Sequence, residues 1–287
     1  MKILITGAEG QLGTALQKIY AGTDEEILVW GKSELDVTNH ARIQERVRET
    51  DPDVIINCAG FHMVEAAEAD IEIAYRGNAF GPGWLSHAAK EVNATMVHLG
   101  TDYIFDGTKP EGYTEADLPC PLNVHGASKL AGEHLVVMAN PKSYILRTSW
   151  VFGSAQSAQK KNFVLRMLEK AKSGEQIRVV ADQYGSPTYA PDLANIIRSI
   201  LEKKIPFGLY HATNSGSCSW YEFTQKIFAL CGIAVPVTPM TTAESGTKVR
   251  RPQYSILKNT RLPELGIPPL RSWEEALADY IQHEIKN

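Results

Sequence analysis

Three glycines near the start of the chain have the spacing of a dinucleotide-binding turn. Gly7, Gly10 and Gly13 follow the apolar run 3–5 and precede a segment, 14–20, with the composition of a helix. A turn between a buried strand and a helix directs backbone N–H groups and the positive helix end at one anion, and glycines let the backbone approach a pyrophosphate. The pattern T-G-x-x-G-x-x-G is one residue wider than the commonest fingerprint, so its position straight after a strand is part of the case for a nucleotide site.

A histidine and a lysine further along the chain have the types and spacing for proton chemistry. His125 and Lys129 are four residues apart in a segment, 123–133, that we predict to be helical, so their side chains lie on one helical face. A lysine ammonium at this distance disfavours a second positive charge, and we expect the pKa of His125 to fall below its usual value of about 6.5. The acid form of His125 would then be scarce at pH 7.

The segments that would position these residues alternate between strands and helices. Strands are predicted at 3–5, 26–30, 53–57, 95–100 and 143–147, and helices at 14–20, about 39–51, about 66–92 and 123–133. This alternation is typical of an α/β fold with a Rossmann-type, doubly wound parallel sheet.

The pattern becomes looser beyond Trp150. Helices are predicted near 160–172, 190–203, 219–231 and 272–285, with short strands at 177–180 and 209–212. We therefore predict an NAD(P)-binding Rossmann domain over residues 1–150 and a smaller C-terminal substrate-binding lobe over residues 151–287, interleaved with the last strands of the sheet.

Size, charge and cysteine spacing argue against several classes of protein. With 287 residues the chain can bury a sizeable core. A net charge of −4 and the lack of a long basic cluster argue against nucleic acid as the main ligand. The 4 cysteines are scattered without a C-x-x-C pair, which predicts free thiols in a reducing cytoplasm. No membrane-length apolar stretch or signal peptide is visible, so a cytoplasmic protein without membrane contact is predicted.

Two segments bear on how a nicotinamide coenzyme would lie. An acid at the tip of the second strand would bind the ribose 2′-hydroxyl of NAD, but residues 31–33 are Gly-Lys-Ser. Lys32 can pair with a 2′-phosphate and favours NADPH over NADH, the alternative being a solvated turn lysine. Small residues after the third strand, Cys58, Ala59 and Gly60, would let the nicotinamide half lie against the backbone.

Several motifs, in their order along the chain, resemble those of the extended short-chain dehydrogenase/reductases and, among them, the dTDP-4-dehydrorhamnose reductases. They are Thr6-Gly7-x-x-Gly10-x-x-Gly13, Thr101-Asp102-Tyr103, Ser128-Lys129 and Arg147-Thr-Ser-Trp150, continued by segments 182–188, 217–223, 251–255 and 272–275. The resemblance covers nearly the whole chain. It implies NAD(P)H-dependent reduction of the C4 ketone of dTDP-6-deoxy-L-lyxo-4-hexulose to dTDP-L-rhamnose, in a pathway for surface polysaccharide.

The resemblance also implies roles for particular residues. Lys129 would hold the nicotinamide ribose hydroxyls and lower the pKa of the proton donor, and Thr101 would hydrogen-bond the substrate oxygen. The implied coenzyme contacts are Gly7, Gly10, Gln11, Leu12, Gly13, Lys32, Asp36, Val37, Cys58, Ala59, Gly60, Asn78 and Lys129. The implied substrate contacts are Thr101, Asp102, Tyr103, Trp150 and Arg251, and the implied catalytic set is Thr101, His125 and Lys129.

The chain departs from the family pattern around this site. His125 stands where the family has the catalytic tyrosine of its Y-x-x-x-K motif, and an imidazole is shorter than a phenol ring. Gly100 stands in place of the usual serine or threonine, and Gly77 in place of the usual valine. Phe61-His62-Met63 replaces the usual Tyr-Thr-x.

These departures leave two functions open. One is a reductase, slow or altered in substrate, whose proton donor is His125, Tyr103 or a water held by His62. The other is a catalytically impaired NAD(P)-binding regulatory or binding subunit of the same fold. Some family members dimerise through magnesium held by an acid on the first helix. Ala15 occupies that position, so a homodimer is predicted without a magnesium or other metal site.

Overall fold

The computed structural model describes residues 1–157 and 161–285. Within these residues the main sheet has six parallel strands in the order β10-β5-β4-β3-β1-β2. The strands are β1 (Lys2–Thr6), β2 (Glu26–Trp30), β3 (Val54–Asn57), β4 (Thr95–Leu99), β5 (Ser143–Arg147) and β10 (Gly208–His211). The predicted Rossmann-type parallel sheet is confirmed.

Apolar residues alternate between the two faces of the central strands. Ile3 and Ile5 of β1 belong to one buried cluster, and Leu4 between them belongs to another. In β3, Ile56 belongs to the cluster of Ile3 and Ile5, and Ile55 belongs to the cluster of Leu4. Because successive side chains point to opposite faces, a strand that is covered on both sides has an unbroken apolar sequence.

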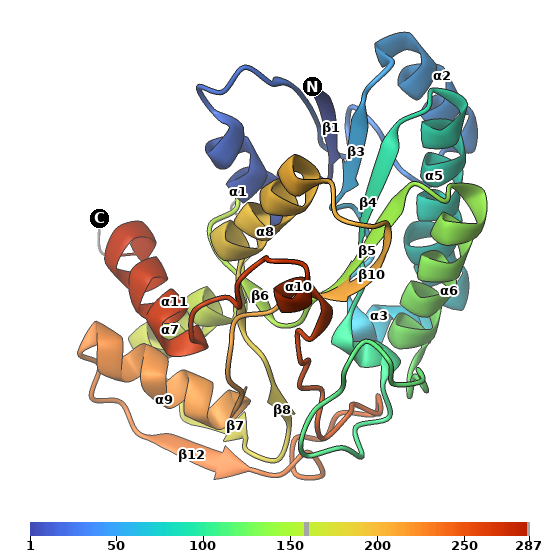
Figure 1. Cartoon of the computed structure of the whole chain (residues 1–287). Helices are drawn as coiled ribbons and strands as arrows, with labels where there is room; N and C mark the ends of the chain where they lie inside the picture. Colours follow the sequence, from blue (N-terminus) through green and yellow to red (C-terminus); the bar gives the residue numbers. More distant parts are fainter. Residues whose placement is uncertain (158–160, 286–287) are drawn as a thin grey trace.

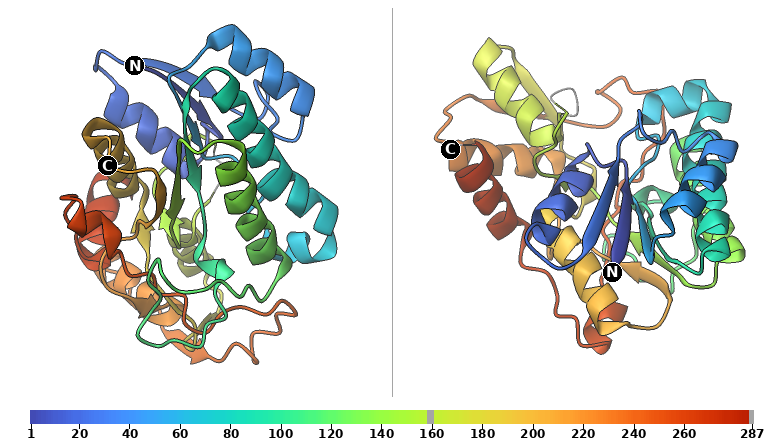
Figure 2. Two further views of the ribbon diagram at one scale, coloured as in Figure 1. Left: turned by 45° about the vertical axis from the view of Figure 1, so that its right-hand side comes forward. Right: turned by 90° about the horizontal axis from the view of Figure 1, so that it is seen from above.

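Helices cover both faces of the sheet. One face carries α1 (Gln11–Tyr20) and α8 (Ala190–Lys203), and the opposite face carries α2 (His40–Thr50), α5 (Gly81–Glu91) and α6 (Val124–Ala139). The two layers lie on either side of the sheet in Figure 1 and in the right-hand view of Figure 2. Because α8 packs against α1 and β10 pairs with β5, the second half of the chain completes the first core.

The rest of the second half has a core of its own. It contains β6 (Val151–Phe152), α7 (Phe163–Ser173), β7 (Ile177–Val180), β8 (Tyr184–Gly185), β9 (Thr188–Tyr189), β11 (Cys218–Ser219), α9 (Trp220–Cys231), β12 (Val237–Met240), α11 (Trp273–Tyr280) and the π-helical turn η3 (Ile281–Ile285). The short helix α10 (Arg261–Glu264) instead packs on the first core through Leu262. Aromatic residues of α7, α9 and α11 pack together in this lobe. The predicted helix near 160–172 starts at residue 160, outside the described residues, as do residues 286–287 of the predicted lobe.

The predicted long helix over about 66–92 is helical along most of its length but is interrupted at Asp70. It forms α3 (Val64–Ala69), α4 (Ile71–Tyr75), a π-helical turn η1 (Arg76–Phe80) and then α5. Asp70 has an extended backbone, and its side chain accepts a 3.1 Å hydrogen bond from Ile73 N–H. A short acidic side chain that bonds nearby N–H groups competes with continuation of the helix. In the described part of the chain, no helix is long and apolar enough to cross a membrane.

Candidate active site

The glycine turn lies at the point where the strand order reverses. β1 is hydrogen-bonded to β2 on one side and β3 on the other, so a crevice opens at the carboxyl ends of β1 and β3. Gly7 has a φ of +63°, and a Cβ on it would lie 2.7 Å from backbone atoms of Cys58 and Ala59. Only glycine fits this position, which brings the turn directly against residues 58–60.

The first helix begins at this crevice, and its N-cap residue forms no side-chain capping bond. Gly10 is the N-cap of α1 and has no side-chain capping bond, so the first N–H groups of the helix are available to an anion. A Cβ on Gly13 would lie 2.6 Å from Ala8, so this glycine lets the helix pack closely against the turn. Leu12 is buried beneath it and Gln11 is half-buried.

Charges of both signs gather at the tip of β2. The Lys32 side chain is 85% exposed, and its ammonium lies 3.8 Å from Asp36 Oδ2. Burial opposes ionisation of Asp36, but hydrogen bonds from Thr38 and the charge of Lys32 hold its pKa below the ordinary value. Glu34 accepts a 2.8 Å bond from Gly31 N–H. Val37, a predicted coenzyme contact, is buried, and its carbonyl oxygen lies next to Gly81 at the start of α5.

Asn78 joins two parts of the site. Its side chain accepts from Phe61 N–H at 2.7 Å, donates to the Phe61 carbonyl at 2.9 Å and donates to Ser128 Oγ at 3.1 Å. These bonds hold the segment after β3 against α6. A Cβ on Gly77 would lie 3.2 Å from Phe61 Cβ, so two departures from the family pattern, Phe61 and Gly77, are neighbours in space.

The start of α6 abuts the turn that follows β4. Asn123 caps the helix by accepting from Gly126 N–H at 2.9 Å. A Cβ on Gly126 would lie 2.1 Å from the carbonyl oxygen of Tyr103, so only glycine permits this approach. The rings of Tyr103 and His125 meet edge to face with centroids 5.9 Å apart. The sequence analysis missed Gly126, because its role depends on a residue more than twenty positions away.

His125 is a neutral imidazole in this environment. Burial is the largest cause that lowers its pKa to about 3, and the charges of Lys129 and His62 lower it further. A backbone hydrogen bond with Phe61 acts in the opposite direction. The direction agrees with the prediction made from Lys129, but burial is the larger cause. His125 Nδ1 has no hydrogen-bond partner among the residues that the structure describes. His62 itself is exposed and lies beside Gly60.

Lys129 is buried at the end of β4. Its ammonium donates to the Leu99 carbonyl, and burial lowers its pKa to about 8, against the charge of Glu133. Its charge also acts on Cys58 at the coenzyme crevice. Thr101, two residues beyond Leu99, accepts a 3.3 Å bond from Tyr103 N–H. The structure thus brings Thr101, Tyr103, His125 and Lys129, all predicted site residues, to one end of the sheet.

A buried ion pair explains the glycine that precedes Thr101. Arg147 Nη2 donates to Glu133 Oε2 at 2.8 Å, and both side chains are almost wholly buried. A Cβ on Gly100 would lie 2.4 Å from Glu133 Oε1 and 2.8 Å from Arg147 Cγ. The pair therefore occupies the space that a larger residue at position 100 would need.

The lobe contributes a basic cavity of about 550 Å³. Its lining has no acidic residue among those described and includes the cations Lys161, Arg166, Lys170, Arg178 and Arg251. The rings of Trp150 and Trp220 stack at 3.4 Å along its wall. Trp150 has a φ of +47°, a conformation that costs a non-glycine residue about 1–2 kcal/mol. Strain of this kind is typical of a binding site.

Two cations of this cavity are unneutralised. Arg166 and Lys170 lie one turn apart on α7, and neither forms an ion pair with any residue within 1–157 or 161–285. By contrast, Lys161, Arg178 and Arg251 have carboxylate partners. The sequence analysis missed Arg166 and Lys170, although their spacing of four in a predicted helix was a usable signal.

Arg251 connects the cavity with the turn that follows β4. Its guanidinium pairs with Glu65 of α3 and hydrogen-bonds the Tyr103 phenol. Burial raises the pKa of Tyr103 to about 12, against the charge of Arg251. The two predicted substrate contacts that lie outside the turn, Trp150 and Arg251, therefore meet in one cavity that adjoins it.

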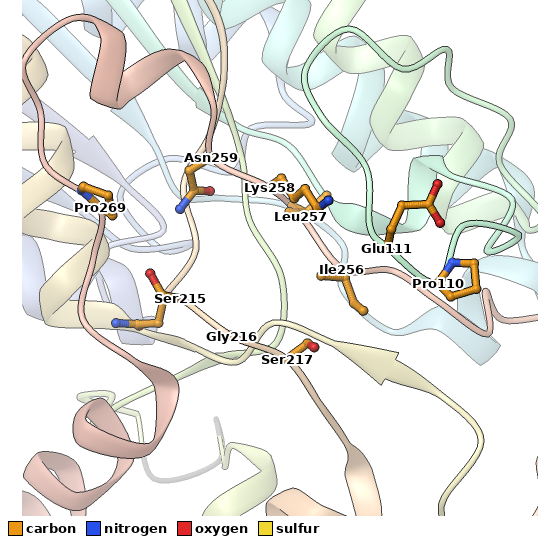
Figure 3. Close-up of a pocket in the computed structure, with 11 residues that line it drawn as sticks. Pro110, Glu111, Ser215, Gly216, Ser217, Ile256, Leu257, Lys258, Asn259 and Pro269 are labelled. Atoms are coloured by element: carbon orange, nitrogen blue, oxygen red, sulfur yellow. The ribbon is translucent and has the colours of Figure 1, made fainter.

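A second cavity, of about 370 Å³, lies between the segments 110–111, 214–217 and 256–259 and Pro269 (Figure 3). Three of its polar side chains already form hydrogen bonds within the protein. Asn214 Nδ2 donates to Asp192 at 2.7 Å, Ser215 Oγ donates to the Leu270 carbonyl, and Asn259 Nδ2 donates to the Thr213 carbonyl at 2.7 Å. These bonds fasten the loops to one another, so the basic cavity is the stronger candidate for ligand binding.

The described residues contain no group of three or more His, Cys, Asp or Glu side chains arranged to hold a metal ion. Ala15, the position considered for a magnesium ligand, is buried in the core that α1 and α8 share. All four cysteines are free, as their spacing predicted.

Comparison with known proteins agrees with this arrangement. Residues 1–285 match the RmlD substrate binding domain family. The spore coat polysaccharide biosynthesis protein SpsK of Bacillus subtilis (strain 168) is 37% identical over 281 residues, covering 98% of this chain and 97% of the relative. A dTDP-4-dehydrorhamnose reductase of Aggregatibacter actinomycetemcomitans is 40% identical over 289 residues, covering 96% of this chain and 97% of the relative.

A solved structure is similar over the same length. The crystal structure of dTDP-4-dehydrorhamnose reductase from Bacillus anthracis str. Ames in complex with NADP superposes with a TM-score of 0.94 at 41% identity and covers 98% of each chain. The resemblance drawn from the sequence motifs is confirmed. The chain belongs to the RmlD substrate binding domain family.

Proposed function

We propose that this chain is an NAD(P)H-dependent reductase that converts the C4 ketone of dTDP-6-deoxy-L-lyxo-4-hexulose to dTDP-L-rhamnose. One observation carries the proposal: Lys129 and Thr101 lie at the end of β4, beside the coenzyme crevice at Cys58, and Arg251 links their turn to the basic cavity. The names of the relatives support the same activity. The predicted homodimer and cytoplasmic location stay predictions from the sequence.

Each part of the site has a task in this reaction. The coenzyme, when bound, supplies a hydride to the carbonyl carbon. Lys129 holds the nicotinamide ribose, and the Thr101 hydroxyl holds the ketone oxygen in line. The unneutralised cations Arg166 and Lys170 bind the diphosphate, for which a cavity without acids is suited. The stacked rings of Trp150 and Trp220 provide an aromatic surface for thymine.

We propose that the coenzyme is NADPH, with NADH also accepted. Lys32 is exposed and free to turn toward a 2′-phosphate, which favours NADPH. Glu34 and Asp36 stand at the same tip of β2, and carboxylates there suit the ribose 2′-hydroxyl of NADH. The mixture of charges predicts a small preference for NADPH.

His125 limits the chemical step. With a pKa of about 3, only about one molecule in 10⁴ carries the imidazolium at pH 7. Proton delivery from His125 itself is therefore inefficient. The same observation favours the second candidate, a coenzyme-binding subunit that has lost its chemistry.

Turnover of the dTDP-ketosugar separates the two candidates. We expect purified protein to oxidise NADPH in the presence of the ketosugar, slowly, and to form dTDP-L-rhamnose, measured by loss of nicotinamide absorbance and by chromatography of the sugar nucleotide. Lys129→Met, the control, should abolish turnover. Coenzyme and sugar binding without turnover would favour the binding subunit, and no binding of either coenzyme would refute both candidates.

Replacement of a cavity cation should weaken substrate binding selectively. We expect Arg166→Met to raise the KM for the dTDP-sugar about 10-fold or more, because a charged hydrogen bond is worth about 1.5–3 kcal/mol. The value of kcat should change less than about threefold. Lys258→Met, in the wall of the second cavity, is the control and should leave both constants unchanged. An unaltered KM in Arg166→Met would place the diphosphate elsewhere.

A further inference from the structure

A buried carboxyl group lies next to Thr101 and is not used by the chemistry above. Asp102 is 3% exposed, at the first position of the short 3₁₀ turn η2 (Asp102–Ile104). Thr101 Oγ lies 3.2 Å from Asp102 Oδ1, within hydrogen-bond distance, and the O–H of a protonated Asp102 can donate to the Thr101 oxygen across this contact. The other carboxyl oxygen, Oδ2, is buried and has no hydrogen-bond partner by geometry among the described residues. Asp102 N–H donates to the Thr148 carbonyl at 3.2 Å, which fixes the turn to the end of β5.

The surroundings of Asp102 favour its protonated form. Burial raises its pKa to about 7, against hydrogen bonds that involve the hydroxyls of Ser255 and Thr101. The titratable and charged groups on the elements packed around the turn include, besides Glu65 and Glu133, the five groups Tyr103, His125, Lys129, Arg147 and Arg251. Two of these cations already have carboxylate partners: Arg147 pairs with Glu133, and Arg251 pairs with Glu65. None of the five outweighs burial at Asp102.

We propose that Asp102 is the proton source for the reduction and delivers its proton to the ketone oxygen through the hydroxyl of Thr101. The proposal rests on the proposed function. It takes from the geometry the 3.2 Å contact between the two side chains, and from the proposed function the position of Thr101 at the substrate oxygen.

The relay conserves atoms and charge. A bound NAD(P)H would supply a hydride to C4 by breaking a C–H bond of its reduced nicotinamide, and the carbonyl π pair would then move onto the oxygen. The Thr101 O–H bond breaks and its proton bonds that oxygen, while the Asp102 O–H bond breaks and its proton restores the Thr101 hydroxyl. Asp102 is left as a carboxylate and regains a proton from solvent after the product leaves. The net reaction consumes one NAD(P)H and one proton for each ketone reduced.

The alternative donors are poorly matched to this task. A general acid works best when its pKa is near the working pH. His125 has a pKa of about 3 and Tyr103 a pKa of about 12, so one is already deprotonated and the other holds its proton tightly. Asp102, at about 7, lies between them.

The test is the pH dependence of kcat/KM for ketosugar reduction, which reports groups of the free enzyme. In the wild type we expect kcat/KM to fall as pH rises above about 7, because the acid form of Asp102 is lost. Asp102→Asn should lose about 100-fold in kcat/KM at pH 6.5. In Asp102→Asn the fall of kcat/KM with rising pH should begin about one pH unit higher than in the wild type, because Lys129 loses its proton near pH 8. Thr101→Val should show a similar loss of rate.

Matched controls separate chemistry from folding. Asp106→Asn makes the same substitution four residues away. The Asp106 side chain accepts hydrogen bonds from the Thr108 and Tyr113 hydroxyls, and this variant should keep the wild-type rate and pH profile. Thermal unfolding and NADPH fluorescence should show that Asp102→Asn is folded and binds coenzyme. Infrared difference spectra should show a protonated carboxyl band at pH 6 in the wild type that is absent in Asp102→Asn.

The outcomes are distinct. A wild type that turns over, together with an Asp102→Asn variant that keeps its rate within threefold or its pH profile, would overturn the relay and leave the reductase intact. Absence of the carboxyl band would also overturn the relay. A wild type that binds coenzyme and sugar without turnover would overturn the proposed function, and the relay with it.

Discussion

His125→Tyr is expected to raise kcat for ketosugar reduction by about 10- to 100-fold. The substitution places a phenol four residues before Lys129, whose ammonium lowers the pKa of a neighbouring acid. A positioned general acid contributes about 10²- to 10⁴-fold, and the expected gain is smaller because Asp102 already supplies protons through Thr101. The ring position is set by edge-to-face packing on Tyr103, which a phenol can also make.

The measurement is kcat for NADPH oxidation at saturating ketosugar. His125→Phe is the control, since it adds a ring of the same shape without the hydroxyl and should show no gain. Wild-type and His125→Tyr rates that are equal would contradict the statement that His125 limits proton donation. Adding Asp102→Asn to the tyrosine variant should cost less than about tenfold, because the phenol then bypasses the relay.

Glu133→Gln is expected to destabilise the protein by about 3–5 kcal/mol, because it leaves the Arg147 guanidinium buried without its counter-charge. Arg147 is already poorly placed to find another acceptor, since its Nη1 has no hydrogen-bond partner within residues 1–157 and 161–285. The free energy of unfolding from urea titration measures the effect.

An exposed ion pair provides the control for this substitution. Arg42 Nη1 and Glu45 Oε2 are 2.6 Å apart on the surface of α2. Glu45→Gln should lower the free energy of unfolding by less than about 1 kcal/mol. Similar losses in the two variants would mean that the buried pair contributes no more than a surface pair. In that case Gly100 would need another explanation than the space that Glu133 and Arg147 occupy.

Local patterns in the sequence predicted the sheet and the glycine turn at its edge. The apolar run 3–5 and the glycines after it are contiguous, and a buried strand followed by a helix is built from neighbouring residues. Gly7 then meets Cys58 and Ala59 because the neighbouring parallel strands β1 and β3 place their carboxyl ends at one edge of the sheet. The broken helix at Asp70 was not predicted, since the same segment is compatible with a continuous helix and the choice depends on a capping bond.

The tertiary structure alone decided the chemistry of the site. The sequence placed His125 beside Lys129 and so determined the direction of its pKa shift, but the size of that shift comes mainly from burial by several elements. Burial likewise makes Asp102 an acid that is protonated near neutral pH, which no spacing in the sequence indicates. Arg166 and Arg251 share a cavity only because the lobe folds back toward the turn. Backbone hydrogen bonds and side-chain periodicity are local and can be read along a chain, whereas desolvation depends on everything packed around a group.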